Sequence, residues 1–155
     1  MEKIQLSNCD LFALVDDADV PLVSEYTWHR KPSSTTVYAA TNIIGSNGKR
    51  TTLSMHRLIL QAKSGQEVDH KDHDGLNNQR ENLRLVSRAQ NVHNTRPFRG
   101  RKFKGVYRHY SGRWYACLKN KCLGVFDDEV SAAIAYNEAA ATILGETAYM
   151  NPIPV

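Results

Sequence analysis

Short apolar runs, rather than long helical repeats, mark the first third of the chain. Residues 4–6 and 12–15 are such runs, and each has the length and composition of a β-strand. Ser54 is a favoured N-cap residue in front of a short apolar segment, so a helix is expected to begin there and to end near Gly65. Residues 1–54 are therefore predicted to form a β-rich lead-in.

The next part of the pattern predicts a strand, a polar loop, a second strand and a helix. Residues 67–70 form a short apolar approach into an Asp-His pair, and residues 71–82 are rich in Asp, Asn and Gly. Residues 83–86 alternate as a short strand does. Ser87 with Gln90 three residues later is a capping-box signature, so the helix is expected to start there. This order brings the first strand opposite the helix.

A second stretch of alternation follows a short basic segment. Its even-numbered positions from Trp114 to Leu118 are predicted to face a helix, and the odd-numbered positions between them to face outward. That helix is predicted over residues 128–144, with Asp127 as its N-cap and Gly145 as its C-terminal stop. Three short strands are predicted to precede it, over residues 103–109, 113–119 and 121–126.

These elements predict an α+β protein with two small domains. The first domain, residues 1–94, holds the lead-in and the strand-loop-strand-helix segment at residues 68–94. Residues 95–102 form a basic linker. The second domain, residues 103–151, is predicted to be a three-stranded antiparallel sheet packed on one helix. A chain of 155 residues is long enough for two small cores.

The polar loop is flanked by residues that suit hydrolytic chemistry. Asp69 and His70 end the first predicted strand, and Asn91 lies on the predicted helix. Carboxylate and amide oxygens are hard ligands that suit Mg²⁺ or Mn²⁺, and a neutral imidazole can take a proton from water near neutral pH. Asn82 is placed to hold the loop and the imidazole by side-chain hydrogen bonds. Together they predict metal-assisted phosphodiester hydrolysis.

The ordered residues Asp-His, DGLNN, ENLR and a final Asn resemble the HNH nucleases with a ββα-metal motif. They are most similar to the phage and intron-encoded kind, which includes homing endonucleases. The resemblance implies that Asp69 and Asn91 bind the metal, His70 is the general base and Asn82 is the structural central Asn. Asn91 stands where many HNH enzymes have His. That variant resembles the nicking subgroup, which implies one divalent ion per site and one strand cut per binding event.

Several other polar and aromatic residues are expected to have structural roles. His73 is expected in the loop and His93 on the solvent side of the helix, although either is an alternative phosphate contact. Residues 16–19 include three Asp but lack the Gly-centred spacing of a calcium loop, so a solvated turn is expected. Residues 45–48 predict a turn, and Trp28 is expected in the core.

Positive charge is concentrated in the middle of the chain. The formal net charge is only +4, yet residues 82–126 contain eleven Lys and Arg and no Asp or Glu. Residues 127–155 contain five acidic residues and no Lys or Arg. An acid-free basic stretch indicates contact with a polyanion. The linker at residues 95–102 carries only positive charge, so it is expected to lie along a DNA backbone.

The stretches FKGVYR, GRWYA, LGVFDDEVSAAIAYNEAA and GETAYMN resemble the plant ethylene-response-factor (APETALA) type of DNA-binding domain. In that family a three-stranded sheet lies in the major groove, which admits such an element. By position, the resemblance implies that Lys104, Tyr107, His109, Cys117 and Lys119 face bases or phosphates. The side chains expected to contact DNA are Arg57, Arg99, Arg101, Lys102, Lys104, Tyr107, Arg108, His109, Arg113, Tyr115, Lys119 and Lys121.

Taken together, these features predict a metal-dependent DNA endonuclease that nicks one strand at sites chosen with its C-terminal domain. The alternative is a non-catalytic DNA-binding protein with a degenerate nuclease domain. An RNA-binding module is disfavoured, because the C-terminal sheet lacks the paired aromatic stacking motifs of an RNA-recognition fold. Double-stranded DNA is the expected partner, with no small-molecule cofactor, and the protein is expected to be a monomer or a weak homodimer.

Cysteine usage and hydropathy indicate the cellular compartment in which the protein is expected. The three Cys are odd in number and form no CxxC pair, which argues against a disulfide framework and against a structural zinc site. No segment has the apolar length of a membrane span, so no membrane association is expected. The protein is therefore expected in the cytoplasm, that of a host cell if it is phage-encoded.

Overall fold

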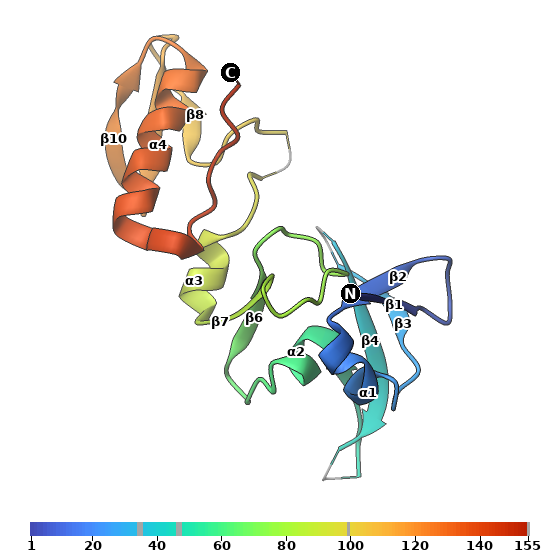
Figure 1. Cartoon of the computed structure of the whole chain (residues 1–155). Helices are drawn as coiled ribbons and strands as arrows, with labels where there is room; N and C mark the ends of the chain where they lie inside the picture. Colours follow the sequence, from blue (N-terminus) through green and yellow to red (C-terminus); the bar gives the residue numbers. More distant parts are fainter. Residues whose placement is uncertain (34–35, 46–47, 99, 155) are drawn as a thin grey trace. The chain divides into compact units, whose positions relative to one another are not determined.

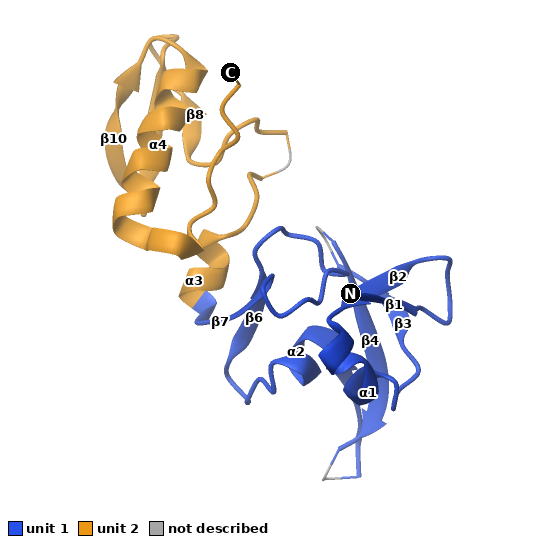
Figure 2. Cartoon of the chain, viewed as in Figure 1, with its two compact units in different colours: residues 1–88 blue, residues 89–155 orange. Residues whose placement is uncertain are grey.

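The chain folds into two compact units, Met1–Arg88 and Ala89–Val155 (Figure 2). The structure is a computed structural model that describes residues 1–33, 36–45, 48–98 and 100–154. Each unit has its own hydrophobic core, so each is described by itself. Several small antiparallel sheets and a few helices make up the protein, which confirms the predicted α+β class.

The first unit begins with a hairpin and a separate three-stranded sheet (Figure 1). The hairpin pairs β1 (Glu2–Gln5) with β2 (Phe12–Val15), as the two apolar runs predict. The sheet has the order β3-β4-β5 and is built from β3 (His29–Pro32), β4 (Val37–Ile44) and β5 (Arg50–Ser54). Part of the turn predicted between β4 and β5 lies outside the described residues. Between hairpin and sheet the chain forms η1 (Asp17–Asp19) and α1 (Val20–Val23).

Trp28 anchors the core of the first unit, as predicted. Its side chain is 1% exposed, and its indole N–H donates to the carbonyl oxygen of Val23 at 2.8 Å. Without that bond, the buried indole N–H would have no hydrogen-bond partner. Residues from both early strands and from α2 (Met55–Ile59) complete the same core.

Helix α2 is shorter than the sequence predicts, since it ends at Ile59 rather than near Gly65. Gln61 adopts a left-handed backbone conformation (φ 49°), which stops the helix. Beyond it, the Arg57 guanidinium donates to the carbonyl oxygens of Ala62, Lys63 and Gln66 at 2.7–3.2 Å. These three bonds hold the segment after the helix as a compact loop.

The remaining elements of this part follow the predicted order. Strand β6 (Glu67–His70) pairs antiparallel with β7 (Leu83–Val86), and the polar loop connects them. Helix α3 (Arg88–His93) comes next. It begins at the last residue of the first unit and continues in the second.

The second unit is a three-stranded antiparallel sheet covered on one face by α4 (Glu129–Leu144) (Figure 1). The sheet has the order β10-β9-β8, so β8 is an edge strand. Ala116 and Leu118 are buried in the core, which confirms the predicted inward face of the middle strand. The short turn η2 (Gly145–Thr147) follows the helix. The strands are β8 (Val106–Arg108), β9 (Trp114–Leu118) and β10 (Lys121–Phe126).

The N-terminus of α4 is one residue later than predicted. Asp128 is the N-cap, and its carboxylate accepts a hydrogen bond from the backbone N–H of Ser131 at 2.8 Å. Asp127, the predicted cap, instead forms an ion pair with Arg113 at 2.8 Å. Two adjacent Asp residues satisfy the same sequence signal, and only the chain direction at the end of β10 decides between them.

The register of β9 and β10 places two cysteines opposite each other. Cys117 pairs with Cys122, and the Cys117 N–H bonds to Gly105 on the other side of β9. The Cys117 N–H therefore points away from β10, and Cys117 and Cys122 form a non-hydrogen-bonded cross-strand pair. The Cα atoms of such a pair lie about 4.5 Å apart, within the disulfide range.

We expect oxidised glutathione to link Cys117 and Cys122. Two thiols would lose their hydrogens and glutathione disulfide would be reduced to two glutathione molecules. Peptide mapping by mass spectrometry, without reduction, measures the link. A Cys122→Ser variant is the control and must lose it. A peptide map in which Cys117 and Cys122 stay unlinked to each other would contradict the register.

Candidate active site

Cross-strand pairing between β6 and β7 sets the first two candidate residues. Asp69 lies opposite Arg84, and His70 lies opposite Leu83. The guanidinium of Arg84 donates to one carboxylate oxygen of Asp69 at 2.8 Å from Nε and 2.7 Å from Nη2. Both side chains are largely buried. The strand register therefore fixes the direction of the Asp69 carboxylate through a charged hydrogen-bonded pair.

The His70 imidazole is enclosed by two other rings. His56, on α2, meets it edge to face with ring centroids 5.0 Å apart. Tyr38, on β4, lies 5.7 Å from His70 and 5.2 Å from His56. Three elements of the first unit thus meet at His70, whose side chain is buried. Sequence reasoning missed both ring neighbours, because they lie well before the polar loop in the chain.

Burial sets the protonation of both histidines. Burial lowers the pKa of His70, although its hydrogen bond with Asn78 and the nearby Asp72 carboxylate oppose the shift. Burial, followed by the neighbouring His70, lowers the pKa of His56 to about 3. Both rings are therefore neutral at pH 7. A neutral imidazole is the form that accepts a proton in general-base chemistry.

Asn82 holds the loop, as predicted. Its amide nitrogen donates to Asp72 at 2.9 Å and to the Asn77 carbonyl oxygen at 2.8 Å, and its amide oxygen accepts from the Asp72 backbone N–H at 3.1 Å. Burial alone would raise the pKa of Asp72, but hydrogen bonds from Asp74, Asn77 and Asn82 lower it below its usual value. The charged carboxylate is thus the centre on which the loop folds.

The imidazole partner is Asn78 rather than Asn82, which corrects the second half of the prediction. Asn78 is fully buried, and its amide oxygen lies 3.5 Å from Nε2 of His70. Its amide nitrogen donates to the Leu76 carbonyl oxygen at 3.1 Å, which assigns the orientation of the amide. The only sequence signal was the adjacent Asn pair in DGLNN, which does not say which amide turns inward.

The acidic residues near position 16 also differ from the prediction, since they bind the polar loop instead of forming a solvated turn. Asp19 is buried and takes two hydrogen bonds from the Arg80 guanidinium, at 2.7 and 2.8 Å. Asp16 accepts from the backbone N–H of Arg80 at 2.8 Å. The backbone of Leu14 adds hydrogen bonds to Leu76 and Asn78, both at 2.8 Å. Hydrogen bonds with the lead-in therefore hold the polar loop, residues 71–82, in place.

Gly75 allows the tip of the loop to lie against β4. A Cβ atom there would meet the carbonyl oxygen of Val37 and would lie 2.6 Å from the ring of Tyr38. The Gly75 N–H donates to the Thr36 hydroxyl at 3.0 Å. This close approach holds the loop beside the same tyrosine that contacts His70, so a larger residue at this position would displace both.

Asn91 and His93 lie on α3 in the second unit, whereas Asp69 and His70 belong to the first. His73 lies in the loop with a left-handed backbone (φ 64°). Across the described ranges, no three or more His, Cys, Asp or Glu side chains are grouped to hold a metal ion. The buried Asp69 carboxylate is nonetheless a donor of the hard type that Mg²⁺ takes while keeping several waters.

The predicted DNA contacts are spread over both units. Arg57 is engaged with the loop after α2, and Arg99 lies outside the described residues. Lys104 caps the end of α3, since its ammonium donates to the carbonyl oxygens of His93 and Thr95, both at 2.7 Å. Burial lowers the pKa of Lys104 to about 8. DNA contact by these side chains stays a prediction.

Five of the other predicted contacts line one cleft of the second unit, described below: Arg101, Lys102, Tyr107, Arg108 and Tyr115. Tyr107 and Tyr115 stack on each other with ring centroids 5.2 Å apart. The sheet thus carries a stacked pair of aromatic rings. The remaining predicted contacts lie at the strand ends and turns: His109, Arg113, Lys119 and Lys121.

Comparison with known proteins places this site in a nuclease family. The sequence profile described as HNH endonuclease matches residues 54–93, which run from the start of α2 to the end of α3. An uncharacterized HNH endonuclease of Acanthamoeba polyphaga mimivirus is 32% identical over 152 residues, covering 92% of this chain and 75% of the relative. The chain belongs to the HNH endonuclease family. No solved structure matches it.

Family membership identifies the class of chemistry as endonuclease chemistry, with DNA as the substrate the family implies and a divalent metal ion as its general requirement. The family profile does not reach the stretch of the second unit that resembles the plant DNA-binding domain, so that resemblance stays a prediction. In the part of the chain that the structure describes, no helix is both long and apolar enough to cross a bilayer.

The Arg80–Asp19 pair should stabilise the first unit measurably. Arg80→Ala leaves a buried carboxylate without its bidentate partner, so we expect the free energy of unfolding to fall by about 1–3 kcal/mol. Urea unfolding at pH 7 measures the change. Asp17→Ala is the matched control: this neighbouring Asp pairs with the N-terminal amine at the exposed surface, and its removal should leave stability unchanged. Equal effects of the two variants would refute the structural role of the pair.

Stability of the first unit should fall as the solution is acidified below pH 6.5. An unfolded His takes up a proton near its ordinary pKa of 6.5, whereas folded His56 does so only near 3. Unfolding then binds a proton, which costs the native state up to about 1.4 kcal/mol per pH unit. His56→Leu should flatten the slope by that amount between pH 6.5 and 5. Parallel curves for variant and wild type would contradict the neutral, buried His56.

Proposed function

We propose that this protein is a metal-dependent DNA endonuclease that nicks one strand, with His70 as the general base. The single observation that supports this best is the enclosure of a neutral imidazole beside a buried carboxylate, on a strand that the family profile covers. A buried His with a lowered pKa serves no charge pairing in the fold. It suits proton transfer near neutral pH.

Asn78 favours one tautomer of His70. The Asn78 amide oxygen can only accept, so it pairs with His70 when Nε2 carries the proton. Nδ1 is then the nitrogen that accepts a proton from the attacking water. The contact is long, at 3.5 Å, so the rings of His56 and Tyr38 are needed to keep the imidazole in place.

Asp69 and Asn91 are the residues that we assign to the metal ion. Arg84 orients the Asp69 carboxylate from within the same strand pair. Asn91 lies on α3, four residues after Ser87 in sequence. Bound there, Mg²⁺ or Mn²⁺ would stabilise the charge that develops on the phosphate and on the leaving oxygen. Asn82 contributes indirectly, because it keeps the loop folded around Asp72.

The second unit is proposed to bind double-stranded DNA and to choose the site. Support comes from its basic, acid-free run and from its likeness to a sheet-based DNA-binding domain. Backbone contacts by Lys and Arg would give affinity that falls with salt. Side chains on the outer face of the sheet would set sequence preference.

His70→Ala should abolish nicking of supercoiled plasmid, with a rate loss of at least about 10²–10⁴-fold, and should leave DNA affinity within a few fold. His73→Ala is the matched control, because it removes a loop histidine that is not assigned to proton transfer. Plasmid conversion and fluorescence anisotropy on the same preparations measure rate and binding. If His70→Ala cuts at the wild-type rate, or His73→Ala is the inactive variant, the assignment of the base is wrong.

Two lysines at the β9–β10 turn test the DNA-binding role of the second unit. Lys119→Ala combined with Lys121→Ala should weaken duplex binding and flatten the slope of log affinity against log salt by about 0.9 for each phosphate that these lysines neutralise. Lys3→Ala, on β1 in the first unit, should leave the slope unchanged. Anisotropy titrations at several salt concentrations measure it. An unchanged slope in the double variant would remove the turn from the DNA interface.

A further inference from the structure

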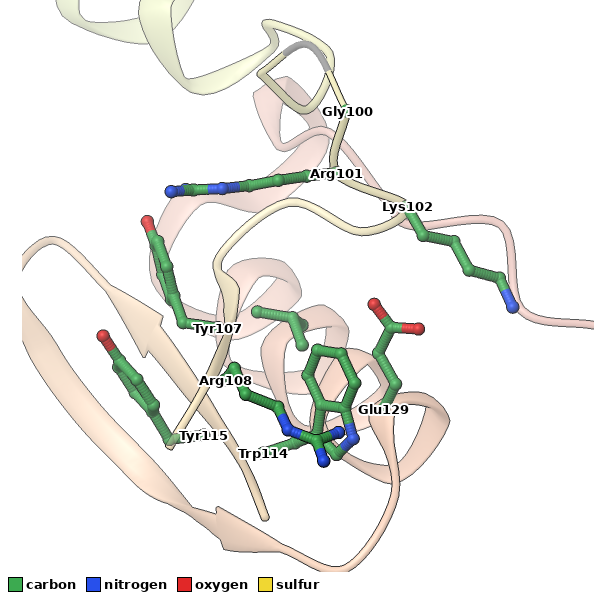
Figure 3. Close-up of a pocket in the computed structure, with 9 residues that line it drawn as sticks. Gly100, Arg101, Lys102, Tyr107, Arg108, Trp114, Tyr115 and Glu129 are labelled. Atoms are coloured by element: carbon green, nitrogen blue, oxygen red, sulfur yellow. The ribbon is translucent and has the colours of Figure 1, made fainter. Parts of the chain in front are cut away.

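A cleft of about 440 Å³ lies beside the edge strand β8 of the second unit (Figure 3). Its lining combines positive charge with aromatic rings. Val106, Gly100 and the Glu129 carboxylate complete the walls. The charged and aromatic lining residues are Arg101, Lys102, Arg108, Tyr107, Trp114 and Tyr115.

Planar groups form two stacks along the cleft. The guanidinium of Arg101 lies 4.4 Å from the centroid of the Tyr107 ring, and Tyr107 stacks on Tyr115 at 5.2 Å with an interplanar angle of 20°. The guanidinium of Arg108 lies 4.9 Å from the ring centroid of Trp114. Tyr107 and Arg108 are neighbours on β8, so their side chains leave opposite faces of the sheet. The cleft therefore wraps around the edge strand, as Figure 3 shows.

We infer that this cleft binds one nucleotide of a DNA strand whose base has left the duplex stack. Tyrosine rings and guanidinium planes stack on the faces of bases. In a paired duplex those faces are hidden, and only base edges and phosphates are offered to a protein. A half-buried stack of tyrosine rings at the edge of the sheet is thus suited to an unstacked base. The volume lies within the range of small-ligand clefts, about 300–1,000 Å³.

The charges in the cleft fit one nucleotide better than a run of phosphates. Arg101 and Arg108 offer planar forks that bind a phosphate through paired hydrogen bonds. Glu129 places a carboxylate in the same lining, and a second phosphate beside it would be repelled. One phosphate on the Arg101 guanidinium and one base on the tyrosine rings, which lie on the same side of β8, therefore account for the cation and the rings together.

The choice of DNA as the ligand rests on the proposed function. A nicked strand has a free end that frays from its complement, so nicking itself produces an unstacked nucleotide. The cleft would hold such a nucleotide, or one extruded at the target site, while the rest of the sheet binds the duplex. Binding in the cleft is separable from cleavage, because none of its residues belongs to the candidate active site.

The test compares two duplexes of equal length that differ by one bulged nucleotide. The full chain is titrated in the presence of a chelator, so that no strand is cut, and anisotropy of labelled DNA measures affinity. We expect the bulged duplex to bind more tightly than the paired one. Tyr107→Ala and Tyr115→Ala should each reduce that preference by about fivefold to 150-fold. Tyr107→Phe and Tyr115→Phe keep the rings and should retain it.

Tyr110→Ala is the matched control, since Tyr110 is 95% exposed and outside the lining. It should leave the preference intact, and circular dichroism checks that each variant is folded. Equal affinity of the wild type for both duplexes would overturn the inference, as would a preference that survives in the Tyr107→Ala, Tyr115→Ala double variant. Tighter binding of single-stranded RNA than of DNA of the same sequence would also overturn it. Plasmid nicking, assayed separately with Mg²⁺, tells failure of the cleft from failure of the nuclease.

Discussion

The candidate active site depends on how a polar loop is kept folded. The loop between β6 and β7 has few apolar side chains to bury, so hydrogen bonds to charged and amide groups replace a hydrophobic anchor. The Asp72 carboxylate accepts hydrogen bonds from Asp74, Asn77 and Asn82, and these bonds hold the loop together. Arg80 ties it to the lead-in through the buried Asp19. With both ends of the loop fixed in this way, Asn78 can be buried against His70.

Local patterns in the sequence predicted the elements that carry the site, whereas contacts between distant segments could not be predicted. Alternation placed β6 and β7 and the start of the following helix, because strand and cap signals lie within a few residues. No such signal links Asp19 to Arg80, which is 61 residues later. The adjacent Asn77 and Asn78 are equivalent in sequence, whereas in the fold Asn77 bonds Asp72 and pairs with Leu14, and Asn78 is buried against His70.

The two units differ in what supports their assignment. The family profile covers α2, the β6–β7 pair and α3, so the nuclease class rests on the segment that also holds the buried His70. Most of the second unit lies outside that segment, and the role proposed for it is supported by charge, by the stacked aromatic rings and by the edge strand that presents them. On the proposed function, the basic second unit would add affinity for DNA to the nuclease unit on the same chain.

Incubation of supercoiled plasmid with the full chain tests whether this protein is a metal-dependent nicking endonuclease. The reactions contain Mg²⁺ or Mn²⁺, with and without a chelator, and gel electrophoresis follows the plasmid forms over time. We expect nicked circles to accumulate well before linear molecules, and we expect the chelator to stop the reaction. Plasmid that stays supercoiled with either ion, or nicking that continues undiminished in chelator, would contradict a metal-dependent nicking endonuclease.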